Sequence, residues 1–85
     1  MTYFTVVDEG YDVDLYRTQK AVSVAMAANG LFFDDIDEDD AENAQPATAK
    51  QIAAALRKNL VVRLVEEAGD RDWKYRIEKH KYIFA

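Results

Sequence analysis

Alternation of apolar and polar residues near the start of the chain predicts a β-hairpin. Residues 2–7 are β-branched or aromatic throughout, which is typical of a strand with both faces partly covered. Residues 11–16 alternate strictly, so that Asp12 and Asp14 share one face, which we expect to be exposed. Between the strands, Asp8-Glu9-Gly10 is a turn sequence in which Gly10 is free to adopt a positive φ.

Two central segments carry capping signals that predict helices. The hydroxyl of Thr18 suits the N-cap of a helix that ends near Ala28, just before an Asn-Gly stop signal. In the second segment, Thr48 and Gln51 have the spacing of a capping box, in which each side chain accepts a hydrogen bond from the other residue's backbone N–H. We expect this second helix to end at Asn59.

Three further segments complete the predicted sheet. Residues 31–33 form a short apolar run, predicted as a strand or a core anchor, and residues 60–66 have the composition of a buried strand. Residues 73–78 alternate cleanly, with Trp73, Tyr75 and Ile77 predicted to point inward. Residues 80–84 either extend this last strand past a bulge or form a closing edge of the sheet.

The order of these elements predicts the fold class. Along the chain it is ββα, a short strand, an acidic loop at residues 34–45, and then αββ. The apolar stripe of each helix must be buried against another element, and the sheet is the only large surface available for it. We therefore expect one α+β domain over residues 1–85, with a mostly antiparallel sheet of four or five strands and both helices on one face.

Composition limits the compartment and adds information on charge. The chain has 85 residues and no cysteine, which excludes disulfides and cysteine-ligated metal sites. Its first residues lack the regions of a signal peptide and no apolar run has the length of a membrane span, so we expect a cytoplasmic protein without a membrane partner.

The net charge of −5 is distributed unevenly along the chain, with 11 acids and 2 bases in residues 1–46 against 5 acids and 9 bases in residues 47–85. This asymmetry predicts an acidic face and a milder basic one.

The acidic segment at residues 34–42 is the strongest single feature, because seven of its nine residues are Asp or Glu. A dense display of carboxylates can occupy a surface built for phosphates, since B-form DNA carries one negative charge per roughly 1.7 Å of its axis. We therefore predict a site for a basic protein or nucleoprotein partner, with two acids of the second strand as neighbours. The predicted site residues are Asp34, Asp35, Asp37, Glu38, Asp39, Asp40, Asp12 and Asp14. The alternative is a solvated loop that only aids solubility.

Nucleophilic catalysis and phosphate-loop chemistry have no support in the sequence. Ser23 is the only serine and His80 the only histidine, and they lie far apart in the chain with no marked acidic partner. The three glycines stand alone, so none of them forms a glycine-rich loop before a helix. We therefore expect no catalytic residues, no cofactor and no enzymatic activity.

The alternate acids Asp35, Asp37 and Asp39 have the spacing of the first ligands of a calcium-binding EF-hand loop. That loop also needs a glycine at its sixth position and a bidentate glutamate at its twelfth. Asp40 and Pro46 occupy those positions here. The acidic segment is therefore expected to attract cations loosely, without a dedicated metal site.

Two other interpretations of the chain stay open. Trp73 and Tyr75 are interleaved with basic residues, a pattern that can bind single-stranded nucleic acid by stacking and phosphate contact. The acidic net charge and the acidic loop argue against direct contact with nucleic acid. The other alternative is a small structural or regulatory domain that forms a homodimer through an open edge strand, such as residues 82–84.

In general character the chain resembles the small acidic inhibitor proteins that phages encode, of which anti-CRISPR proteins and DNA mimics are familiar kinds. The resemblance is one of size and composition, carried by the short single domain, the DDIDEDDAE segment, the YDVDLY strand and the lack of catalytic groups. It implies a protein that inhibits nucleic-acid-handling machinery in a host cytoplasm. The basic second half departs from a uniformly acidic mimic, so only one surface of the molecule would act in this way.

Overall fold

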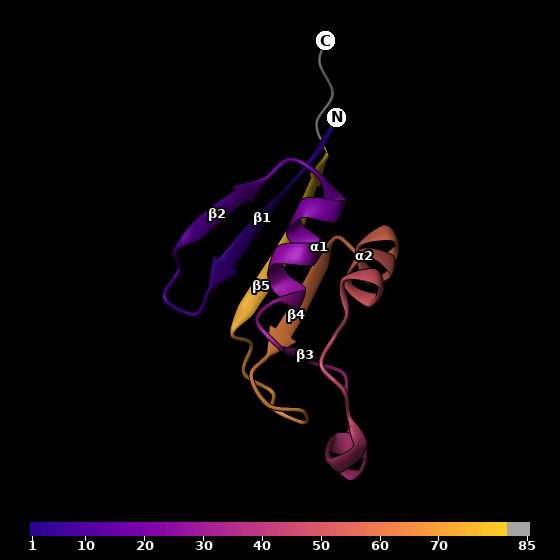
Figure 1. Ribbon diagram of the computed structural model, residues 1–85. Coiled ribbons are helices and arrows are strands. Elements are labelled where there is room, and N and C mark those ends of the chain that lie inside the picture. The colour runs from indigo at the N-terminus through magenta and orange to yellow at the C-terminus, as the bar shows by residue number, and fades with distance from the viewer. Residues whose placement is uncertain (82–85) are drawn as a thin grey trace.

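A five-stranded antiparallel sheet with two helices on one face forms the molecule (Figure 1), and the computed structural model describes residues 1–81. Along the chain, the elements are β1 (Thr2–Asp8), β2 (Val13–Tyr16), α1 (Gln19–Ala27), β3 (Phe32–Phe33), the 3₁₀ helix η1 (Glu38–Asn43), α2 (Ala49–Lys58), β4 (Val61–Val65) and β5 (Tyr75–Lys81). The strands lie in the order β2-β1-β5-β4-β3. This arrangement confirms the predicted α+β class and the predicted order of elements.

The core lies between the helices and the sheet face that they cover. In β1, Phe4 and Val6 point toward the helices, while Thr5 lies on the opposite, open face, as the period of two requires. Leu64 of β4 and Ile77 of β5 are fully buried on the covered face. The helical side chains that pack against them are Val22 and Met26 of α1 and Ile52 and Leu56 of α2.

The helix ends follow the capping signals in the sequence. Thr18 is the N-cap of α1, and its Oγ1 accepts a hydrogen bond from the Ala21 N–H at 3.0 Å. The capping box of α2 is complete, because Thr48 Oγ1 accepts from the Gln51 N–H at 3.1 Å and Gln51 Oε1 accepts from the Thr48 N–H at 3.0 Å. Asn59 is the C-cap of α2. All these predictions are confirmed, since they depend only on local hydrogen bonding.

Ser23 of α1 is buried in the helix–sheet layer, with 2% of its surface exposed, and its Oγ has no hydrogen-bond partner within residues 1–81. Because a buried hydroxyl without a partner costs free energy, Ser23→Ala should raise the free energy of unfolding by about 1 kcal/mol, and the higher helix propensity of alanine adds to this. Urea denaturation measures the change. Ala21→Ser, at an exposed position of the same helix, is the control and should shift stability by less than about 0.5 kcal/mol. A loss of stability in Ser23→Ala would contradict the prediction.

The turn of the β1–β2 hairpin differs from the prediction in its conformation. The residue with a left-handed backbone is Tyr11, with φ of 65°, whereas Gly10 does not have a positive φ. The Asp8 side chain explains the turn, because its Oδ1 accepts hydrogen bonds from the N–H groups of Gly10 and Asp12 at 2.8 and 3.0 Å. This carboxylate holds the chain in a shape that places the left-handed residue one position later than expected.

The last described strand, β5, lies at the centre of the sheet between β1 and β4. All of its residues pair with β1 in one continuous register, from Tyr75 opposite Asp8 to Lys81 opposite Thr2. The predicted extension of the strand is therefore confirmed for residues 80 and 81, but it has no bulge and these residues do not form an edge. The part of that prediction that concerns residues 82–84, including their role as an open edge, lies outside the described residues.

Two predictions of inward side chains are also corrected. Trp73 precedes β5, so the alternation of the strand does not extend to it. Its ring lies against the guanidinium of Arg76, a residue on the open face of the sheet. Tyr75 and Ile77 do pack in the core, as predicted. In β4, Val62, Leu64 and Val65 are buried, but Val61 and Arg63 are exposed. Residues 60–66 are therefore a half-buried strand.

Candidate functional site

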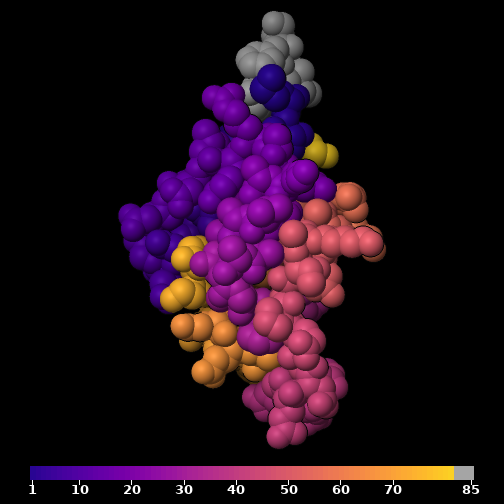
Figure 2. Space-filling model, viewed as in Figure 1, coloured from indigo at the N-terminus to yellow at the C-terminus, as the bar shows by residue number. Residues whose placement is uncertain are grey.

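The acidic segment is ordered as a short 3₁₀ helix at one end of the molecule. It was predicted as a loop, and the structure corrects this over η1, with Asp37 as the N-cap and three acids in the first turn. Carboxylates in the first turn are favourable because the free N–H groups of a helix N-terminus carry partial positive charge. The segment projects beyond the sheet and helices as a knob at the bottom of Figures 1 and 2. Its acids are therefore presented to solvent away from the core.

The knob rests against the loop between β4 and β5. Gly69 has a left-handed φ of +91°, and a side chain at this position would meet Ala41 and Glu38 of the knob at ordinary contact distances. An open, mostly polar hollow lies between the knob and this loop, where the loop contributes Asp70 and Arg71. The knob contributes Asp34, Asp35, Ile36, Asp37, Glu38 and Asp39. Five of the predicted site residues thus line one concave surface, with Arg71 as the only base among its lining residues.

The strand directions bring the remaining acids to this same end of the molecule. The register places Asp8 at the end of β1 beside Tyr75 at the start of β5, and Tyr75 beside Leu64 near the end of β4. The connections after β1 and β4 therefore leave the sheet at one end, and the contact of Gly69 with Ala41 and Glu38 places the knob, which follows β3, at this end as well. Apart from Asp14 and Glu78, every Asp and Glu of the chain lies in these connections, in the knob or at Asp8. We call this region the acidic end.

Basic residues gather at the opposite end. Lys79 and Lys81 close β5, and Lys79 Nζ donates a hydrogen bond to the Leu56 carbonyl near the C-terminus of α2. Cations suit that position because the carbonyl groups at a helix C-terminus carry partial negative charge. The other bases of this basic end are Arg17, Lys20, Arg57 and Lys58. The two halves of the sequence predicted an acidic face and a basic face, and the fold converts this asymmetry into two ends.

Asp12 and Asp14 are exposed, but they do not adjoin the knob. Asp14 belongs to β2 and Asp12 directly precedes it, whereas the knob follows β3. Because β2 and β3 are the two outer strands of the sheet, three strands separate these acids from the acidic segment. Their predicted role as direct neighbours of the knob is therefore wrong, although Asp12 still belongs to the acidic end.

Lys74 forms ion pairs with two acids at the acidic end. Its Nζ lies 3.4 Å from Glu9 Oε1 and 3.9 Å from Glu66 Oε2. Glu66, followed by Glu9, raises the pKa of Lys74 above its ordinary value of 10.5. The ion pairs join the β1–β2 turn to the β4–β5 loop. Their contribution to stability is complete below pH 10.5 and is lost as the pH rises through the raised pKa.

An aromatic contact at the acidic end was not predicted from the sequence. Tyr11, which is 74% exposed, meets the Trp73 ring edge-on at 6.5 Å between centroids. The guanidinium of Arg76 lies over the Trp73 ring at 4.9 Å and its Nε is 2.9 Å from Glu78 Oε2. Glu9 and Asp12 of the hairpin turn and Asp70 and Asp72 of the β4–β5 loop lie within three residues of this cluster in the sequence. The only signal in the sequence was an aromatic residue in each of two acidic turns.

His80 and Ser23 lie on opposite sides of the sheet. His80 Nε2 is 2.8 Å from Thr5 Oγ1, and its ring stacks on Tyr3 with 4.7 Å between centroids, both on the open face. Ser23 is on α1, which covers the other face. His80 was expected at the surface or at an edge, and the structure places it half-buried in the central strand. The sheet therefore keeps these two residues from forming a catalytic pair.

The acidic end is a surface of charged and aromatic side chains. Over residues 1–81, no group of three or more His, Cys, Asp or Glu side chains has an arrangement that could hold a metal ion. Neither α1 nor α2 nor any other helix in this range is long and apolar enough to cross a bilayer.

Comparison with protein-family models, with curated proteins and with solved structures finds no match to this chain.

Proposed function

We propose that this protein is a binding protein that docks its acidic end on a basic surface of a nucleic-acid-handling protein complex and so inhibits or regulates it. The observation that supports this proposal most is the collection of almost all Asp and Glu residues in the connections at one end of the sheet. Surfaces that bind phosphates are rich in Arg and Lys. Carboxylates on a folded scaffold can pair with those same side chains.

The shape of the acidic end supports this role. The knob projects from the body of the molecule, so its carboxylates can enter a recess in a partner (Figure 2). It is ordered by η1 and backed by the loop at Gly69, which reduces the entropy lost on binding. The basic end lies at the far side of the fold, so a positively charged partner attracts one end and repels the other. Such a charge distribution orients the molecule before contact and raises the association rate.

The test begins with an affinity pull-down from bacterial lysate at low and at high salt, followed by mass spectrometry. The proposal expects a basic nucleic-acid-handling protein that is retained at low salt and released at high salt. A variant with Asp37, Glu38, Asp39 and Asp40 neutralised to their amides should not retain it. If native protein and variant retain the same proteins equally, the proposal is wrong.

The second stage compares two variants that remove the same charge from different places. One variant carries Asp39→Asn and Asp40→Asn in the knob. The other carries Asp12→Asn and Asp14→Asn, which lie just before and within β2 at the opposite edge of the sheet. With the captured partner, we expect the knob pair to weaken binding at least tenfold more than the strand pair and to flatten the dependence of Kd on salt. Surface plasmon resonance at several salt concentrations measures both quantities. Equal effects of the two pairs would place the contact elsewhere.

A further inference from the structure

The outer edge of β2 has the properties of an unfinished sheet. β2 is the last strand on its side, so one row of its backbone N–H and C=O groups has no strand partner among residues 1–81. On its open face, Val13 and Leu15 are each 60% exposed, and these are the positions where an edge strand normally carries charge. The opposite edge, β3, has only two residues. β2 is therefore the edge that can accept another strand.

We infer that β2 pairs in antiparallel fashion with β2 of a second copy, around a two-fold axis at Leu15, which joins two sheets into one of ten strands. In an antiparallel pair, two residues that lie directly opposite each other point to the same face of the sheet. The two-fold axis must therefore relate one residue to its own copy, and it cannot lie between two consecutive residues. An axis at Asp14 would place two carboxylates opposite each other, which is unfavourable. An axis at Leu15 instead opposes Leu15 to Leu15, Val13 to Arg17 and Asp14 to Tyr16.

Charge complementarity favours the second copy as the occupant of this edge. The two-fold axis reverses one protomer relative to the other, so the acidic end of each lies beside the basic end of its mate. In this register Asp12 approaches the mate's Thr18, which is the N-cap of α1, with Arg17 and Lys20 on either side. The first turn of α1 contains no acid of its own. A carboxylate from the mate would therefore meet both the helix N-terminus and two bases.

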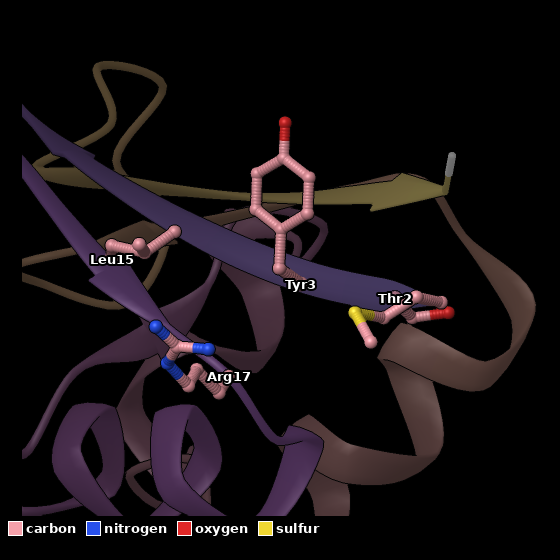
Figure 3. Close-up of a pocket in the computed structure, with 5 residues that line it drawn as sticks. Thr2, Tyr3, Leu15 and Arg17 are labelled. Carbon is pink, nitrogen blue, oxygen red and sulfur yellow. The ribbon is translucent and has the colours of Figure 1, made fainter. Parts of the chain in front are cut away.

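The open face contributes an apolar contact at the same axis. Leu15 and Arg17 line an open hollow together with Met1, Thr2 and Tyr3, and Tyr3 projects from β1 away from the helices (Figure 3). In the pairing above, the two Leu15 side chains meet and the stem of Arg17 lies over Val13 of the mate. The knob is at the other edge of the sheet and stays accessible, so this dimer and the proposed docking of the acidic end do not depend on each other.

The first test is the mass of the native full chain by sedimentation velocity between about 10 µM and about 1 mM, a range that detects weak association. The native chain should shift from monomer to dimer, and Leu15→Lys should raise the dissociation constant at least tenfold. Leu60→Lys is the matched control, because Leu60 is 61% exposed and precedes β4, away from β2, and it should leave the dissociation constant unchanged. A monomeric native chain at 1 mM, or equal effects of the two substitutions, would overturn the inference.

The second test fixes the register, using the fact that the chain has no cysteine. Across the axis, Leu15→Cys places two Cα atoms about 4.5–5.5 Å apart, within the range of a disulfide. Val13→Cys places its two copies roughly 13 Å apart, because they are offset by four residues along the strands. Under mild oxidation, Leu15→Cys should form a covalent dimer rapidly and Val13→Cys should not. Faster cross-linking of Val13→Cys would overturn the register. Binding of a peptide or of an unrelated protein to the β2 edge in place of a second copy would also overturn the inference.

Discussion

Truncation of Leu64 to alanine should lower the free energy of unfolding by about 2–5 kcal/mol. Leu64 is fully buried on the covered face of β4, in the cluster with Ile52, Leu56 and Ile77. Removing its side chain loses buried apolar surface and leaves a cavity between two strands and a helix, which cannot collapse without moving the sheet. For a small domain with a total stability of about 5–15 kcal/mol, this is a large fraction. Equilibrium denaturation in urea, followed by Trp73 fluorescence and by circular dichroism, measures the loss.

The matched control for this prediction is Leu60→Ala. Leu60 is 61% exposed and lies just before β4, so the same chemical change removes little buried surface. Its effect should stay within about 0.5 kcal/mol. Similar losses from the two substitutions would show that the covered face of β4 is not the centre of the core.

Replacing Gly69 by valine should destabilise the fold by about 1–3 kcal/mol, because a β-branched residue is strained at a left-handed backbone position. Gly69 has φ of +91°, and space alone is not the obstacle, since a Cβ there meets its nearest neighbour, the Ala41 Cβ, at 3.5 Å. The substitution also presses on the knob through Ala41 and Glu38. Thermal unfolding measures the change, and hydrogen exchange of the η1 amides should report faster local opening.

Ala68→Val is the control, because it adds a side chain of the same final size one residue earlier, where the backbone is not left-handed. It should cost less than Gly69→Val. If the two variants lose equal stability, added bulk in the loop would be the cause and the backbone argument would be wrong.

Local signals predicted the helices well, and the reason is physical. The caps at Thr18, Thr48 and Asn59 depend on hydrogen bonds within a few residues, so their sequence spacing already contains the geometry. Alternation likewise predicted where strands form, because a period of two can be satisfied by any sheet with one covered face. These two kinds of signal were sufficient for the fold class and for the order of elements.

The side on which a strand is buried could not be predicted where it depends on distant neighbours. Val13 and Leu15 alternate as if they belonged to a core, yet β2 is an outer strand and they lie on the face without helices. Trp73 continues the alternation of β5 in the sequence, but the strand begins two residues later. The left-handed backbone at Tyr11 follows from the hydrogen bonds of one carboxylate, and no propensity scale contains such information.

The candidate site was predicted in part. The acidic segment was evident from composition, and its residues do line one concave surface. The contribution of Glu66, Glu67, Asp70 and Asp72 was missed, because they lie in the half of the chain that is basic overall. The strand directions bring that loop to the same end as the hairpin turn, and its contact with Ala41 and Glu38 brings the knob there. Charge summed along a sequence therefore hid a separation that the antiparallel topology creates.

The central position of β5 has a consequence for how the chain folds. β1 and β4 obtain their common partner only when residues 75–81 arrive, and the pairing of Thr2 with Lys81 closes a loop of almost the whole described chain. Contacts this distant in sequence must overcome loop-closure entropy before they contribute, so folding should be slow for so small a domain. During synthesis, the emerging chain can form its first hairpin and both helices, yet it cannot complete the sheet. Until then, the unpaired edges of β1 and β4 are open to chaperones and to aggregation.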